Sequence, residues 1–185
     1  MIWITSGLPR SGTSMMMQMV EKAGIPILMD TTRAADESNP KGYFEYDPVN
    51  RLKQDNSWIE NADGKAVKII SVFLEELPAH LDYGIIFMER DIDSILESQR
   101  KMLSRQGLKS PADQSLLKAT FSSQLARTKT FLKSQGNMQV AYFNYETVLE
   151  RPKAAAERLV NFLGTGRAID IAAAVEPDLR TVLSK

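Results

Sequence analysis

The sequence predicts an α/β fold in which a parallel sheet of four or five strands is covered by helices on both faces. Short, continuous apolar runs such as 84–89 alternate with helical segments, as strands buried on both faces do. A loop bracketed by Gly7 and Gly12 joins the first strand to the first helix, and this spacing is that of a phosphate-binding P-loop. At 185 residues, the chain is expected to form one domain, 1–185.

The first strand, loop and helix form the segment that predicts most about function. An apolar run at 2–4 predicts a buried strand, and no helix breaker follows Thr13 until Gly24. A loop at a helix N-terminus turns backbone N–H groups inward, and these bind anions together with the helix dipole. A nucleoside-triphosphate loop places a lysine after Gly12, whereas here the cation lies inside the loop, at Arg10. A glycine-rich turn without a ligand is the alternative.

The next third of the chain combines short strands with a long polar loop. Residues 25–29 predict a second strand, 47–60 a modest helix and 66–73 another strand. The polar segment 30–48 is long for a plain connection, and such loops often carry function.

Candidate general bases and one unusual lysine lie in this third. Glu45 is the first candidate, because the aromatic residues just before it could desolvate its carboxylate and raise its pKa. Glu37 is the second candidate and Asp36 the third, with a solvated acidic loop as the alternative for each. Lys68 interrupts an apolar run, so it either reaches solvent or faces an anion. His80 is expected in a surface loop without a catalytic role.

Arg90 directly follows the apolar run 84–89 and precedes a helix that Asp91 or Asp93 can cap. Ligands bind at the carboxyl ends of strands in open α/β sheets, so Arg90 is expected at a ligand-binding edge. A guanidinium group binds phosphate oxygens with paired hydrogen bonds, and a surface ion pair is the alternative.

The last third predicts two helices, a strand between them and a short helix in the tail. Pro152 suits the first turn of a helix, and Gly164 suits its end. The expected ranges are a helix over 113–134, a strand over 138–143, a helix over 153–163 and a short helix within 167–185.

Composition excludes several classes of site. The 23 acidic and 23 basic residues give no net charge, and therefore no general field that would attract nucleic acid or a membrane surface. With no cysteine and one histidine, disulfides, thiol nucleophiles and Cys or multi-His metal sites are excluded. A strand that begins at residue 2 and the lack of a long apolar run predict neither a signal peptide nor a membrane span. A cytoplasmic location is expected.

Three parts of the sequence resemble the sulfotransferase superfamily. The stretch 8–14, LPRSGTS, resembles its 5′-phosphosulfate loop, Pro-Lys/Arg-Ser-Gly-Thr-Thr/Ser. Arg90 and Ser98 have the separation of the pair that holds the 3′-phosphate in that family. Tyr145 and the glutamate after it match the first two residues of the family's Tyr-Glu-Asp. The resemblance implies a P-loop fold and the donor 3′-phosphoadenosine 5′-phosphosulfate, which has no γ-phosphate.

The resemblance also implies roles for particular residues. Arg10 and Lys68 would stabilise the charge that develops in a sulfonate transfer, and Glu45 or Glu37 would be the base, because the histidine of cytosolic members is absent. Met15 lies where the family often has a tryptophan facing the adenine, and Tyr145 either contacts the adenine or covers the core. The implied donor-binding residues are Arg10, Ser11, Gly12, Thr13, Ser14, Met15, Arg90, Ser98 and Tyr145.

The expected activity is sulfonate transfer to a hydroxyl or amine, without a metal. The acceptor would be a small molecule, a glycan or a peptide, and a homo-oligomer is left open. Two other classes remain. One is a P-loop kinase or nucleotide hydrolase, which predicts the lysine that is absent after Gly12. The other is a non-catalytic nucleotide-binding module that keeps the sulfotransferase fold.

Overall fold

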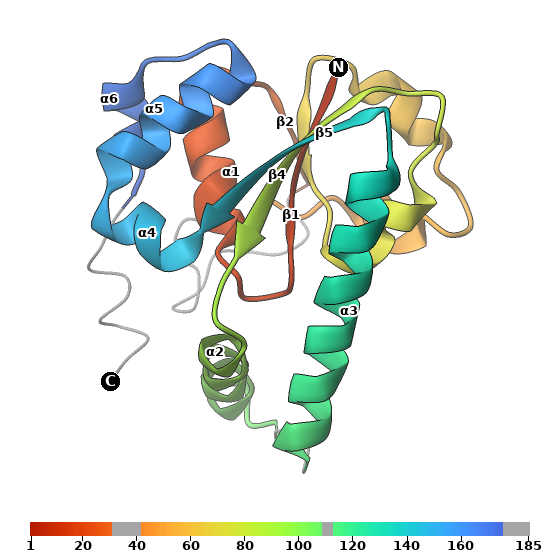
Figure 1. Cartoon of the computed structure of the whole chain (residues 1–185), viewed down its shortest axis with the longest axis vertical. Coiled ribbons are helices and arrows are strands. Elements are labelled where there is room, and N and C mark those ends of the chain that lie inside the picture. Colours follow the sequence, from red (N-terminus) through yellow and green to blue (C-terminus); the bar gives the residue numbers. More distant parts are fainter. Residues whose placement is uncertain (31–41, 109–112, 176–185) are drawn as a thin grey trace.

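Parallel strands form a single sheet at the centre of the molecule (Figure 1). The computed structural model describes residues 1–30, 42–108 and 113–175. In these residues the sheet has five strands in the order β2-β3-β1-β4-β5, and every pairing is parallel. The prediction of a parallel sheet of four or five strands is therefore confirmed. The strands are β1 (Ile2–Gly7), β2 (Ile27–Leu28), β3 (Ala66–Lys68), β4 (Tyr83–Glu89) and β5 (Met138–Asn144).

Helices cover both faces of the sheet, as Figure 1 shows. One face is covered by α1 (Thr13–Lys22), α4 (Tyr145–Glu150), α5 (Pro152–Leu163) and α6 (Ala168–Ala172). The other face is covered by α3 (Gln114–Ser134) and by three 3₁₀-helices, η1 (Asp47–Arg51), η2 (Ser57–Ala62) and η3 (Ser71–Glu76). Helix α2 (Ile92–Arg105) lies beyond the carboxyl edge of the sheet, beside the N-terminal half of α3.

The two central strands explain the apolar runs that the sequence shows. Ile2 and Ile4 of β1 enter the core on the side of the 3₁₀-helices, whereas Trp3 packs on the side of α1. In β4, Phe87 and Ile86 divide in the same way. Because successive side chains of a strand point to opposite faces, a sheet covered twice requires apolar residues at consecutive positions.

Two predicted elements are shorter than expected. The helix expected at 47–60 is replaced by η1 and η2, because the carboxylate of Asp55 accepts hydrogen bonds from both the backbone N–H and the hydroxyl of Ser57 and so forms a turn between them. The strand expected at 66–73 ends at Lys68. The buried Ile69 and the cap residue Ile70 then lead into η3, which contains the last apolar residues of the run and the fully buried Leu74. An apolar run therefore continued from a strand into a short helix that contacts the same core.

Helix α4 was not expected from the sequence. Asn144, the last residue of β5, caps it by accepting a hydrogen bond from the backbone N–H of Thr147 at 2.9 Å. The cap turns the chain directly from a strand into a six-residue helix. Within the described residues, no helix combines the length and the apolar character needed to cross a bilayer.

Replacing Gly84 by alanine is expected to lower the free energy of unfolding by about 1–3 kcal/mol. Gly84 lies opposite Trp3 in the sheet, and a Cβ atom added there would come within 2.3 Å of the indole ring. The ring also packs edge-on against Phe162, with centroids 5.7 Å apart, so it has little room to move. Urea unfolding curves measure the change. Gly136→Ala is the control, because nothing lies within 4 Å of that added Cβ, and equal effects of both substitutions would contradict the steric account.

Candidate functional site

The loop between β1 and α1 presents an uncapped helix N-terminus. Gly12, the N-cap residue of α1, offers no side-chain cap, and the first turn of the helix contains no acidic residue. The N–H groups of a first helical turn have no partners within the helix, so they are available to an anion. The hydroxyl of Ser11 is buried, and it has no hydrogen-bond partner among the described residues. A buried, unsatisfied donor beside free amides suits an anionic ligand.

Glycine is required at both ends of this loop. A Cβ atom at Gly7 would lie 2.5 Å from the Ser11 hydroxyl and 2.6 Å from the carbonyl oxygen of Met88. At Gly12, where φ is +97°, a Cβ atom would lie 2.4 Å from the ring of Tyr145. The two glycines that suggested a P-loop therefore let the backbone lie against β4 and α4.

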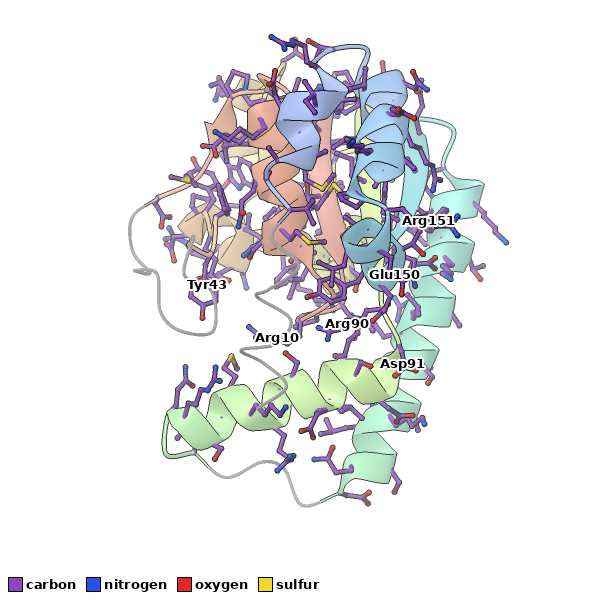
Figure 2. All side chains as sticks on the ribbon, turned by 90° about the vertical axis from the view of Figure 1, so that its left-hand side faces the viewer. Arg10, Tyr43, Arg90, Asp91, Glu150 and Arg151 are labelled. Carbon is purple, nitrogen blue, oxygen red and sulfur yellow. The ribbon has the colours of Figure 1, made fainter. Side chains whose placement is uncertain are left out.

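Two arginines and a serine from three different elements meet beside the loop. The Arg10 Nε donates a hydrogen bond to the Ser98 hydroxyl in α2 at 3.1 Å. The Arg90 Nη1 donates one to the backbone carbonyl of Arg10 at 3.0 Å. Arg90 follows β4, and the carboxylate of Asp91 caps α2, which carries Ser98. In Figure 2, Arg10 and Arg90 lie close together between the sheet and α2.

The side chain of Arg90 is more enclosed than that of an exposed arginine that binds a phosphate group. Its guanidinium carbon lies 4.2 Å from the centroid of the Tyr145 ring, and its Nε lies 3.6 Å from the Glu146 carboxylate. Only 14% of its side chain is exposed. The contact with Glu146 had no specific signal in the sequence beyond the position of that residue after Tyr145.

Lys68 lies at the carboxyl end of β3 and does not reach solvent. Its ammonium group donates a hydrogen bond to the backbone carbonyl of Tyr43, and only 9% of its side chain is exposed. The same carbonyl accepts a bond of 3.4 Å from the hydroxyl of Ser14, in the first turn of α1. The alternative of a solvent-reaching lysine is therefore wrong, because a polar main-chain group inside the fold compensates the charge.

The three candidate bases have different outcomes. Glu45 lies 3.9 Å from the ammonium group of Lys68, at the side of the loop. Its side chain is 42% exposed, because Phe44 turns into the core and does not enclose it. The expectation that aromatic neighbours desolvate Glu45 is thus wrong. Glu37 and Asp36 lie outside the described residues.

The remaining predicted residues differ in how deeply they are buried. Thr13 is buried at the start of α1, and Met15 is partly buried against the core on that side. Tyr145 is 8% exposed and contacts both Arg90 and the core, so its surroundings fit the core-covering role better than an open adenine contact. His80 is exposed and lies 3.6 Å from the carboxylate of Glu60, as expected of a surface histidine.

A hydrogen bond also lowers the pKa of Asp91, the N-cap residue of α2. The backbone N–H of Ser94 donates to the carboxylate of Asp91 at 2.8 Å. This bond holds the pKa of Asp91 below its usual value, so the cap stays ionised near neutral pH. An ionised cap at the helix N-terminus helps to keep α2, and with it Ser98, beside the loop.

No protein-family model and no curated protein sequence matches this chain. Solved structures do align with it. The sulfotransferase domain from the curacin biosynthetic pathway aligns with a TM-score of 0.56 and 15% sequence identity, covering 97% of this chain and 85% of that domain. A sugar kinase from Janibacter sp. aligns with a TM-score of 0.45 and 15% identity, covering 94% of this chain and 97% of the kinase.

The sheet, its helices and the glycine-bracketed loop define a P-loop-type α/β fold. A sulfotransferase domain shares this fold, so the resemblance noted from the sequence holds at the level of the fold. At 15% identity, the likeness concerns fold alone.

Proposed function

We propose that the protein transfers a sulfonate group from 3′-phosphoadenosine 5′-phosphosulfate to a hydroxyl or amine acceptor. The observation that carries the proposal is the meeting of Arg10, Arg90 and Ser98 beside an uncapped helix N-terminus. A triphosphate loop would instead carry a lysine at position 13, where this chain has threonine. The guanidinium groups of Arg10 and Arg90 suit a nucleotide that carries phosphate groups at two positions and has no γ-phosphate.

The residues of the loop fit a 5′-phosphosulfate group. The buried hydroxyl of Ser11 lacks a partner among the described residues, and Gly12 lets the start of α1 lie directly against the Tyr145 ring. The backbone N–H groups of Gly12 and Thr13 and the hydroxyls of Thr13 and Ser14 would hold the phosphosulfate, whereas the N–H of Ser11 donates to the carbonyl of Leu8 at 3.1 Å. Arg90 and Ser98 would serve the 3′-phosphate. Met15 is the candidate for the adenine side, because Tyr145 packs against Arg90 and the core.

In the proposed reaction, the bond between the sulfonate sulfur and the phosphate oxygen breaks while a bond from sulfur to the acceptor forms. The donor supplies an already activated sulfonate. Arg10 and Lys68 would stabilise the negative charge that develops on the phosphate oxygen, the kind of contribution that is often largest in catalysis. Glu45 would take the proton that the acceptor loses, with Glu37 as the second candidate. The half-exposed carboxylate of Glu45 is accessible to an acceptor.

We expect 3′-phosphoadenosine 5′-phosphate to bind the protein and Arg10→Ala to weaken that binding about tenfold or more, because a charge-assisted contact is lost. Isothermal titration calorimetry measures both affinities. Arg127→Ala is the control, since its side chain is 74% exposed and pairs with Glu75 on α3's side of the sheet. Transfer of the sulfonate to a simple phenol or amine then separates an enzyme from a non-catalytic binding module.

Two results would contradict the proposal. One is the absence of binding at millimolar concentrations of the bisphosphate. The other is tighter binding of ATP with Mg²⁺ than of the bisphosphate, which would favour a P-loop kinase or nucleotide hydrolase.

A further inference from the structure

Arg90 reaches the main chain of the loop at the residue whose backbone conformation is least favourable. Arg10 has a φ of +69°, in the left-handed region where the Cβ of an L-residue crowds the following carbonyl. Such a conformation persists only when its surroundings hold it in place. The hydrogen bond of 3.0 Å from Arg90 Nη1 to the Arg10 carbonyl is such a restraint.

Arg90 is itself fixed on its other sides. Its guanidinium group stacks on the ring of Tyr145 at 4.2 Å, within the range of a cation–π contact. The Glu146 carboxylate, 3.6 Å from Nε, compensates its charge. A residue that is held in this way can transmit rigidity from α4 to the loop.

The same stack touches the loop a second time. The ring of Tyr145 occupies the space where a side chain at Gly12 would lie, and Gly12, like Arg10, has a positive φ. Arg90 and Tyr145 therefore contact two of the residues that give the turn its shape. Figure 2 shows the side chains of Arg10 and Arg90 close together on this side of the sheet.

The geometry points to Arg90 as a positioning residue that clamps the β1–α1 loop in its anion-binding conformation. The clamp acts through the Arg10 carbonyl, and Tyr145 and Glu146 hold Arg90 in place. This inference goes beyond the proposed function, because it concerns how the loop is held whichever anion the loop binds. A residue that served only as a ligand for a 3′-phosphate would leave the loop unchanged when removed.

Amide hydrogen exchange in the unliganded protein tests the clamp directly. In Arg90→Ala and Arg90→Lys, exchange in a peptide covering 8–14 is expected to accelerate about fivefold or more, as the loss of one net hydrogen bond predicts. Exchange in β4 at 83–87 is expected to stay within about twofold, because the core is untouched. The lysine variant keeps the positive charge, so it separates the clamp from a charge effect. Arg127→Ala is the control for a lost exposed arginine.

Ligand binding gives a second, independent measurement. A clamp predicts that Arg90→Lys weakens adenosine 5′-monophosphate as well as 3′-phosphoadenosine 5′-phosphate, since both need the loop; the bisphosphate loses more, because Arg90 would also contact its 3′-phosphate. A 3′-phosphate ligand predicts a loss for the bisphosphate alone, and that result would overturn the inference. Unchanged exchange at 8–14 in both variants would overturn it as well. If neither nucleotide binds the unmodified protein, the proposed function fails, while the exchange measurement still decides the clamp.

Discussion

Alanine in place of Gly12 is expected to abolish nucleotide binding and to lower the free energy of unfolding by about 2–4 kcal/mol. Two physical effects add here. The left-handed backbone at φ +97° disfavours any residue with a Cβ, and that Cβ would meet the Tyr145 ring at 2.4 Å. To relieve the contact, the loop must move away from α4, and the first-turn amides of α1 then lose their common direction. Calorimetric unfolding and titration with 3′-phosphoadenosine 5′-phosphate measure the two losses.

Two further variants separate the backbone effect from the steric effect. Gly64 has a φ of +71° with nothing within 4 Å of an added Cβ, so Gly64→Ala measures the cost of the backbone conformation alone. Combining Gly12→Ala with Tyr145→Leu removes the ring and should recover part of the lost stability. A loss in Gly12→Ala no greater than that in Gly64→Ala would show that the contact with Tyr145 costs nothing.

Replacing Lys68 by methionine is expected to slow sulfonate transfer about 10²–10³-fold while changing the affinity for 3′-phosphoadenosine 5′-phosphate less than about threefold. Methionine has a similar length and keeps the packing at a position where 9% of the side chain is exposed. What it removes is a positive charge beside the first turn of α1, where Ser14 and Lys68 meet at the Tyr43 carbonyl. Charge stabilisation that operates mainly in the transition state affects the rate more than binding.

Release of the bisphosphate from the donor, followed with a simple phenol or a simple amine present, measures this rate. Lys53→Met is the matched control, because that lysine is 58% exposed and pairs only loosely with Glu76, at 3.7 Å. Equal rates in Lys68→Met and the unmodified protein would show that Lys68 serves the fold and not the reaction. Equal losses of kcat/KM and of affinity, with kcat unchanged, would instead assign it to ground-state binding.

The residue patterns of the sequence were sufficient to predict the sheet and the loop at its edge. The strands β1, β4 and β5 follow from apolar runs, since burial on both faces leaves a strong signal at consecutive positions. The loop at 7–12 follows from two glycines whose roles are steric. The position of Arg90 at that edge was also expected, since ligands bind at the carboxyl ends of parallel strands, whereas Ser98 was indicated only by the family resemblance.

What the sequence did not reveal depends on main-chain atoms and on turns. The Tyr43 carbonyl, which accepts hydrogen bonds from both Ser14 and Lys68, has no signature, because every residue carries a carbonyl. The bond from Arg90 to the Arg10 carbonyl is hidden for the same reason. The replacement of one predicted helix by η1 and η2 depended on a side chain that bonds to its own backbone neighbourhood, which local propensity describes poorly.

The order of the strands has a consequence for how the protein is made. β1 is synthesised before the other described strands, yet in the sheet it lies between β3 and β4, with Trp3 opposite Ala66 and Gly84. During synthesis, β1 therefore remains without its partner strands β3 and β4 until much of the chain has emerged from the ribosome. Contacts so distant along the sequence close slowly and leave a nascent chain exposed to aggregation. The strand that leads into the anion-binding loop is thus expected to complete its pairing only after β4 has been made.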